Sequence, residues 1–92
     1  MRGHKIQLVA RNEGLRYEDE IGVLRFEVSK QGRTWFVLVP PTKEPHLALE
    51  NLSVAERERI YPRISSFLAR IWWLGVWPRK YDVEFRAKDQ HA

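Results

Sequence analysis

The segment 35–39, Trp-Phe-Val-Leu-Val, constrains the fold more than any other part of this chain. It places apolar side chains on both faces of an extended backbone and is rich in residues with high β-propensity. A turn sequence containing Gly32 precedes it, and Pro40 and Pro41 follow, where proline donates no hydrogen bond to a sheet. We therefore predict a central strand over residues 33–40, covered on both faces.

Alternating patterns predict the strands around this one. Residues 5–10 alternate in side-chain direction, and Leu24, Phe26 and Val28 share one face of a half-buried strand. A change of phase around Gly22 indicates a β-bulge. The predicted strands are therefore 5–10, 17–30, 33–40 and 81–86, of which the first three form an antiparallel meander.

A helix is predicted over residues 53–74. Ser53 and Glu56 have the spacing of a capping box, in which each side chain accepts a hydrogen bond from the backbone of the other. Gly75 suits the position just after the last helical turn. Between these ends, apolar residues recur at a helical period of about 3.6 residues and form one stripe. The stripe consists of Ile60, Ile64, Phe67, Leu68, Ile71 and Leu74.

Pro62 lies inside this helix and cannot donate to the carbonyl group four residues earlier. We expect a kink near Tyr61, or two successive helices over 53–60 and 62–74. Either way, the element order is β-β-β-α-β.

This order predicts an α+β two-layer sandwich that spans residues 1–92 as a single domain. The last strand can lie at either edge of the sheet. The polar tail 87–92 is expected to fray.

One helix covers only one face of such a sheet, and Phe36 and Leu38 point to the other face. Leaving about 300 Å² of apolar surface wet would forgo roughly 7 kcal/mol. Either the connection 42–52, with Leu47, Leu49 and Leu52, folds over this face, or a second subunit does. We predict a homodimer with twofold symmetry.

Composition limits the class of protein. The chain is 43% hydrophobic and 30% charged, which is typical of a globular domain. It has no cysteine, which excludes disulfides and thiolate metal sites and fits a cytoplasmic location. The basic N-terminus lacks the apolar run of a signal peptide, and no apolar run approaches the length of about 20 residues that spans a membrane.

The sequence contains few candidates for a metal site or a catalytic site. His4, His46 and His91 are far apart in the sequence, so we expect no metal site and no cofactor. The acidic row at 18–20 is interpreted as a solubilising sheet edge. No catalytic motif is present, so we expect a protein that is not an enzyme.

A second stripe on the predicted helix is basic. Arg59, Arg63 and Arg70, together with Trp73, fall on one face at spacings of three and four residues. Guanidinium groups beside an indole ring could bind nucleic acid through phosphates and base stacking. A net charge of +4 agrees with an acidic partner, although it also serves solubility alone. The alternative is a solvated face on which the arginines pair with Glu56 or Glu58.

Three of the four tryptophans lie near the end of this helix. The helical period places Trp72 at the edge of the apolar stripe, where it would belong to the core. It places Trp73 on the opposite side, where a partner or water would meet it. Trp72, Trp77 and Tyr81 are also candidates for an aromatic small-molecule pocket.

These patterns favour a small interaction domain, not an enzyme, that associates with itself. A nucleic-acid-binding module with the basic stripe is the alternative, and a small-molecule binder with the aromatic pocket is a third possibility.

Overall fold

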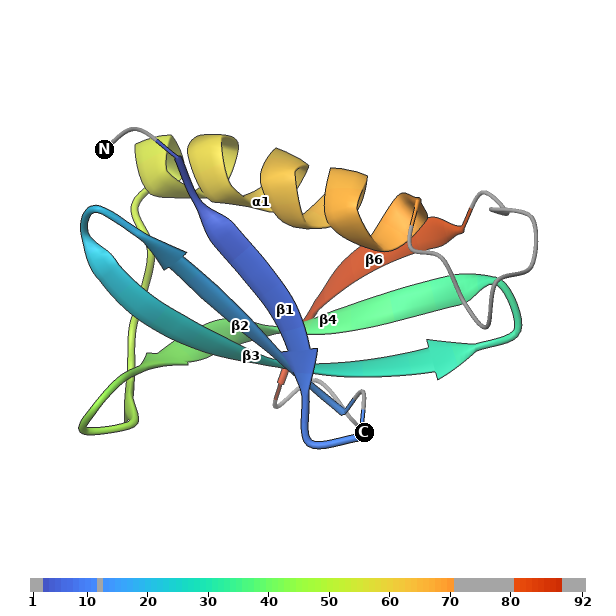
Figure 1. Cartoon of the computed structure of the whole chain (residues 1–92), viewed down its shortest axis with the longest axis horizontal. Coiled ribbons are helices and arrows are strands. Elements are labelled where there is room, and N and C mark those ends of the chain that lie inside the picture. The colour runs from blue at the N-terminus through green and yellow to red at the C-terminus, as the bar shows by residue number, and fades with distance from the viewer. Residues whose placement is uncertain (1–2, 12, 71–80, 89–92) are drawn as a thin grey trace.

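The computed structural model describes residues 3–11, 13–70 and 81–88, which form a curved sheet with one helix across its concave face (Figure 1). The α+β class is confirmed, with a meander followed by a helix and a last strand. Among the described residues, no helix is long and apolar enough to cross a membrane. The elements are β1 (Lys5–Val9), β2 (Gly14–Asp19), β3 (Gly22–Gln31), β4 (Thr34–Lys43), β5 (Ala48–Leu49), α1 (Val54–Ala69) and β6 (Asp82–Ala87).

The predicted strand 17–30 is two strands, β2 and β3, that pair antiparallel. The phase change at Gly22 marks a tight turn between them and not a bulge. Gly22 has a φ of 133°, which strains any residue with a Cβ atom. Asp19 closes the turn by accepting a hydrogen bond from the backbone N–H of Ile21 at 2.9 Å. The true irregularity in pairing lies between Arg25 and Glu27, opposite the two prolines of β4.

Strand β4 has partner strands on both of its edges. One of its edges pairs antiparallel with β3, and the other pairs parallel with β6, from Thr34 opposite Asp82 to Val39 opposite Ala87. The last strand thus takes the edge beside β4, a choice that the sequence left open. The predicted fraying of the tail is wrong for its first two residues, because Ala87 belongs to β6 and the N–H of Lys88 donates to the carbonyl of Val39.

The helix begins as predicted. The side chain of Ser53 accepts from the N–H of Glu56 at 3.1 Å, and the Glu56 carboxylate accepts from the N–H of Ser53 at 2.9 Å. The helix is one continuous element through Pro62, so the alternative of two helices is wrong. Ile60 and Ile64 are both fully buried on either side of the proline. Their packing offsets the cost of the missing hydrogen bond, about 3 kcal/mol. The helix runs to Ala69 and has Arg70 as its C-cap, and residues 71–74 of the predicted helix lie outside the described residues.

The core lies between α1 and the concave face of the sheet. Ile60, Ile64 and Leu68 of the predicted stripe are completely buried, as the helical period indicated. They form one cluster with buried residues of β2, β3 and β4, so the core is continuous across these three strands. The indole nitrogen of Trp35 has no hydrogen-bond partner among the described residues. The buried sheet residues are Leu15, Tyr17, Leu24, Phe26, Val28, Trp35 and Val37.

The convex face of the sheet, which was predicted to be apolar, also carries charged side chains. Phe36 and Leu38 are half-buried, and the Arg86 guanidinium lies 4.2 Å from the centre of the Phe36 ring. Of the three leucines in the connection 42–52, Leu47 and Leu49 are exposed by 56% and 62% and do not cover this face, whereas Leu52 is half-buried and packs against the core. Thr42 and Lys43 instead extend β4 and pair with the short strand β5.

Candidate functional site: the groove between β1 and α1

The arginines of the predicted basic stripe have different surroundings. Arg59 and Arg63 turn towards the sheet and pair with Asp19, at 3.4 Å and 3.7 Å between guanidinium nitrogen and Oδ2. Their partner is therefore not Glu56 or Glu58 of their own helix. Arg70 is the exposed residue that ends the helix. Trp73 lies outside the described residues.

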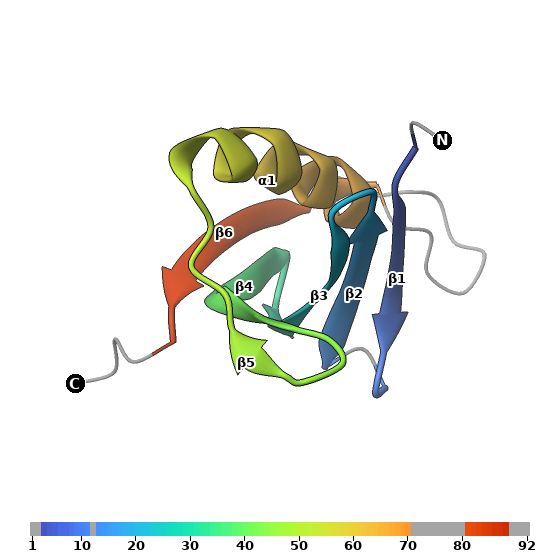
Figure 2. The same cartoon turned by 90° about the vertical axis from the view of Figure 1, so that its left-hand side faces the viewer.

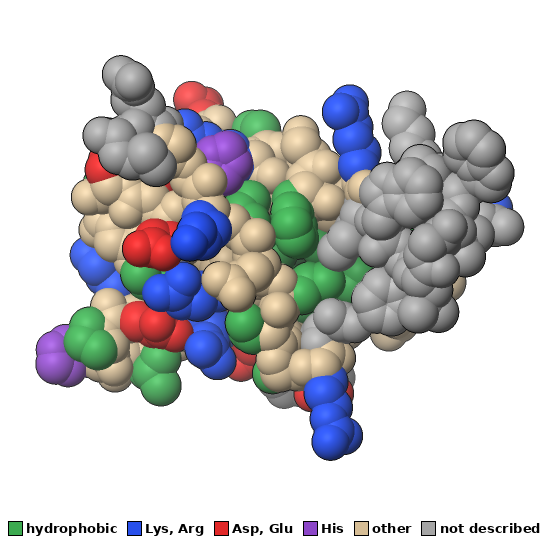
Figure 3. All heavy atoms as spheres, in the orientation of Figure 1, with side chains coloured by type: hydrophobic (Ala, Val, Ile, Leu, Met, Phe, Trp, Pro, Cys, Tyr) green, Lys and Arg blue, Asp and Glu red, His purple; other side chains and the backbone are tan. Residues whose placement is uncertain are grey.

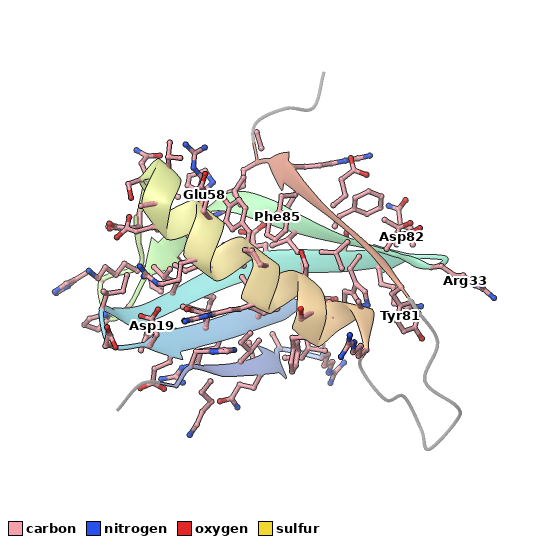
Figure 4. The ribbon with its side chains drawn as sticks, turned by 90° about the horizontal axis from the view of Figure 1, so that it is seen from above. Asp19, Arg33, Glu58, Tyr81, Asp82 and Phe85 are labelled. Carbon is pink, nitrogen blue, oxygen red and sulfur yellow. The ribbon has the colours of Figure 1, made fainter. Side chains whose placement is uncertain are left out.

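Asp19 is the centre of a partly buried polar cluster that joins α1 to the turn after β2 (Figure 4). Only 3% of its side chain is exposed, so the expectation of a solubilising edge is wrong for this residue. The Tyr17 hydroxyl donates to Asp19 Oδ2 at 2.6 Å and accepts from Arg63 Nη1 at 2.8 Å. Two guanidinium groups thus share one carboxylate, which leaves a positive charge in this cluster.

Burial and hydrogen bonding act in opposite directions on Asp19. Burial alone would raise the pKa of its carboxyl group, but hydrogen bonds from Tyr17 and the Ile21 N–H, with the charge of Arg59, lower that pKa below 3.8. For Tyr17, burial and the hydrogen bond to Asp19 raise the pKa above 10.0, against the opposing effect of Arg63. The cluster therefore holds a charged Asp19 and a neutral Tyr17 at neutral pH.

An open groove of about 580 Å³ lies beside this cluster, between strand β1 and helix α1. Hydrophobic side chains reach the surface in the hollow next to α1 (Figure 3). Its volume is within the range of about 300–1,000 Å³ for ligand sites. The groove has apolar walls, the charged guanidinium group of Arg63 and a few neutral polar groups. The lining residues are His4, Ile6, Pro62, Arg63, Ser66 and Phe67.

Strand β1 forms one wall of the groove and is an edge strand of the sheet. It pairs on one side with β2 and stands at the end of the strand order, beside α1 and on the opposite side from β6 (Figure 2). Along its five residues the backbone groups that point away from β2 have no partner strand among the described elements. His4, just before β1, stacks on Tyr17 with ring centres 6.0 Å apart and so connects the groove to the Asp19 cluster.

The predicted aromatic pocket is only partly within the described residues. Trp72 and Trp77 lie outside them. Tyr81 is half-buried, with the Lys30 ammonium 5.1 Å from its ring centre, and its N–H donates to the carbonyl of Ala69. Tyr81 therefore joins the start of β6 to the end of α1.

Among the described residues, no group of three His, Asp or Glu side chains is placed to hold a metal ion. Sequence reasoning identified Arg63, with Ser66 on the same helix face, but did not join them to Asp19, Tyr17, His4, Ile6 and Phe67 in one candidate site. The signal that could have found Asp19 was its place two residues after a buried Tyr17, on the same face of a strand. The chain matches no protein-family model, no curated protein and no solved structure.

Proposed function

We propose that this chain is an interaction domain, not an enzyme, that binds an extended protein segment in the groove between β1 and α1. The observation that carries this proposal is the edge of β1 that pairs with no other described strand, beside a groove with apolar walls. An extended segment can add to such an edge through main-chain hydrogen bonds, while pockets for alternate side chains supply specificity. A cytoplasmic location, which the lack of cysteine suggested, is part of this proposal.

The geometry supports strand addition in particular. Ile6 and Leu8 of β1 are only partly buried, as is Phe67 of α1, although all three pack against the core. A segment lying along β1 would cover these side chains and satisfy the unpaired backbone groups of the strand in one step.

Selection from a random-peptide display library against the immobilised chain tests the proposal. For the best peptide, hydrogen exchange should slow at those amides of residues 5–9 that point away from β2, and the Ser66 and Phe67 resonances should shift. Peptides that bind while leaving β1 unchanged would refute strand addition at this edge, as would the recovery of no peptide.

A matched pair of variants locates the binding surface. Phe67→Ser removes an apolar wall of the groove and should weaken peptide binding by at least about tenfold. Val54→Ser removes an apolar side chain that is 59% exposed, at the start of α1 and outside the groove, and should leave binding unchanged. Thermal melts of both variants separate lost binding from lost folding.

Self-association is a second candidate, favoured by Phe36 and Leu38, which are only half-buried on the convex face. A twofold homodimer through that face would cover both side chains. Light scattering after size exclusion at low micromolar concentration decides it: a mass near the 11.0 kDa of one chain contradicts the homodimer.

Nucleic-acid binding by Arg59, Arg63, Arg70 and Trp73 is supported less, because Arg59 and Arg63 already pair with Asp19. Fluorescence polarisation with single- and double-stranded oligonucleotides at low and high salt tests it. If Arg63→Ala with Arg70→Ala leaves any such binding unchanged, the stripe has no part in it.

A further inference from the structure

We infer that the segment bound in this groove is acidic, with a carboxylate against Arg63 and an apolar side chain between Ile6 and Phe67. The inference rests on the proposed function and adds the chemistry of the partner. It derives from the distribution of charge around the groove and from the donors that Arg63 has left.

The described residues that line the groove include no Asp or Glu, and Arg63 alone among them has a permanent charge. That charge is incompletely neutralised, because Arg59 and Arg63 share Asp19 and the Asp19 oxygen lies closer to Arg59. A carboxylate from a partner would supply the missing negative charge in a partly desolvated site, where such a pair is stronger than in water.

Arg63 retains donors for such a partner. A guanidinium group has five N–H donors, and the hydrogen bond of Arg63 to the Tyr17 hydroxyl uses only Nη1. Its side chain is 30% exposed, so the remaining N–H groups can reach the groove. Because Asp19 and Tyr17 hold this side chain in place, Arg63 loses little conformational entropy when a partner binds to it.

A second copy of β1 does not fit this chemistry. Residues 1–11 contain Arg2, Lys5 and Arg11 but no Asp or Glu, so a paired second copy would bring positive charge to a positive groove. The bound segment is therefore not the β1 strand of a second copy.

The charges around the groove also indicate where the acidic residue of the bound segment lies. Beyond His4 lies a second hollow of about 460 Å³, lined by Glu18, Asp19 and Glu20 with Lys5 as the opposing charge. The sign of the nearby charge thus changes at His4. The acidic residue of the segment belongs on the Arg63 side, and an acidic residue beyond His4 would be repelled.

The test uses the same peptide selection and counts Asp and Glu in the recovered peptides against the unselected library. We expect enrichment of acidic residues for the wild-type chain. Ser66→Glu places a carboxylate at an exposed position of the groove and should abolish that enrichment. It should also weaken a peptide selected on the wild type by about fivefold. Ala55→Glu adds the same charge to an exposed position of the same helix outside the groove and should leave both results unchanged.

The outcomes separate the two proposals. Peptides that protect β1 without acidic enrichment, or with basic enrichment, overturn the acidic partner and leave the interaction domain standing. Equal weakening by Ser66→Glu and Ala55→Glu also overturns it, because the effect would then come from overall charge. If no peptide binds at β1, the interaction domain itself is refuted and the acidic partner with it.

Discussion

Replacing Asp19 with asparagine tests whether the polar cluster around Asp19 stabilises the fold. Asparagine has nearly the same shape but only one acceptor oxygen, so it can accept either from the Ile21 N–H, which bonds to Oδ1 of Asp19, or from the Tyr17 hydroxyl, which bonds to Oδ2, but not from both. It loses the negative charge that faces Arg59 and Arg63. A hydrogen bond to a charged group contributes about 1.5–3 kcal/mol, against about 0.5–1.5 kcal/mol for a neutral one.

The two arginines are 37% and 30% exposed. When the carboxylate is lost, water can therefore hydrate their guanidinium groups and offset part of the lost interaction energy. We therefore expect Asp19→Asn to lower the free energy of unfolding by about 2 kcal/mol at neutral pH. Urea denaturation followed by circular dichroism measures this difference. Glu18→Gln is the control, because Glu18 pairs with Arg16 at 3.1 Å from a side chain that is 43% exposed. Its expected cost is below about 1 kcal/mol.

The pH dependence gives a second, independent reading. Because the pKa of Asp19 is lowered in the folded protein, its stabilisation is complete above the unfolded value of 3.8 and is lost as the pH falls through the folded value. The gap between wild type and Asp19→Asn should therefore close on acidification. A gap below about 0.5 kcal/mol at neutral pH, or one that persists unchanged in acid, would refute the reasoning.

Three further outcomes are expected from the same structure. Ser53→Ala removes half of the capping box and should cost about 1 kcal/mol in urea denaturation, with Glu56→Ala showing a smaller loss. Gly22→Ala forces a Cβ atom into a φ of 133° and should cost about 1–3 kcal/mol, measurable as a lower melting temperature. Burial raises the pKa of Tyr17 and of Tyr61 above 10.0. Their contribution to the free energy of unfolding should therefore be complete below pH 10 and be lost as the pH rises through the folded pKa values. The variant Tyr17→Phe should show a smaller loss of stability at high pH.

Local signals predicted much of this fold because they act between neighbours. The capping box of Ser53 and Glu56 and the buried stripe with Ile60 and Ile64 depend only on spacing along one helix, and the structure confirms them. The turn at Gly22 was missed because an acidic row precedes it, without the Asn-Gly or Pro signals that usually mark a hairpin. Pro62 shows the reverse case, in which packing outweighs a strong local preference.

The candidate site was harder to predict because its contacts join distant parts of the chain. Asp19 and Arg59 are 40 positions apart, and no local pattern distinguishes Asp19 from its exposed acidic neighbours. The groove exists because α1 packs over β2, β3 and β4 while β1 remains to one side of it, which depends on how the helix lies on the sheet. Sequence periodicity shows which face of a helix is buried, but not which strands it covers.

The parallel pairing of β4 with β6 has a consequence for the order of folding. Hairpin contacts between β3 and β4 join residues close in the chain, whereas Thr34 meets Asp82 only after the whole helix has been traversed. Contacts of long sequence separation form late because closing the intervening loop costs entropy. Until β6 docks, the edge of β4 that carries Trp-Phe-Val-Leu-Val is open to other chains, and such a segment favours aggregation. We therefore regard β6 as the cover of the most aggregation-prone strand, and a chain that ends before it should precipitate rather than remain as a smaller folded domain.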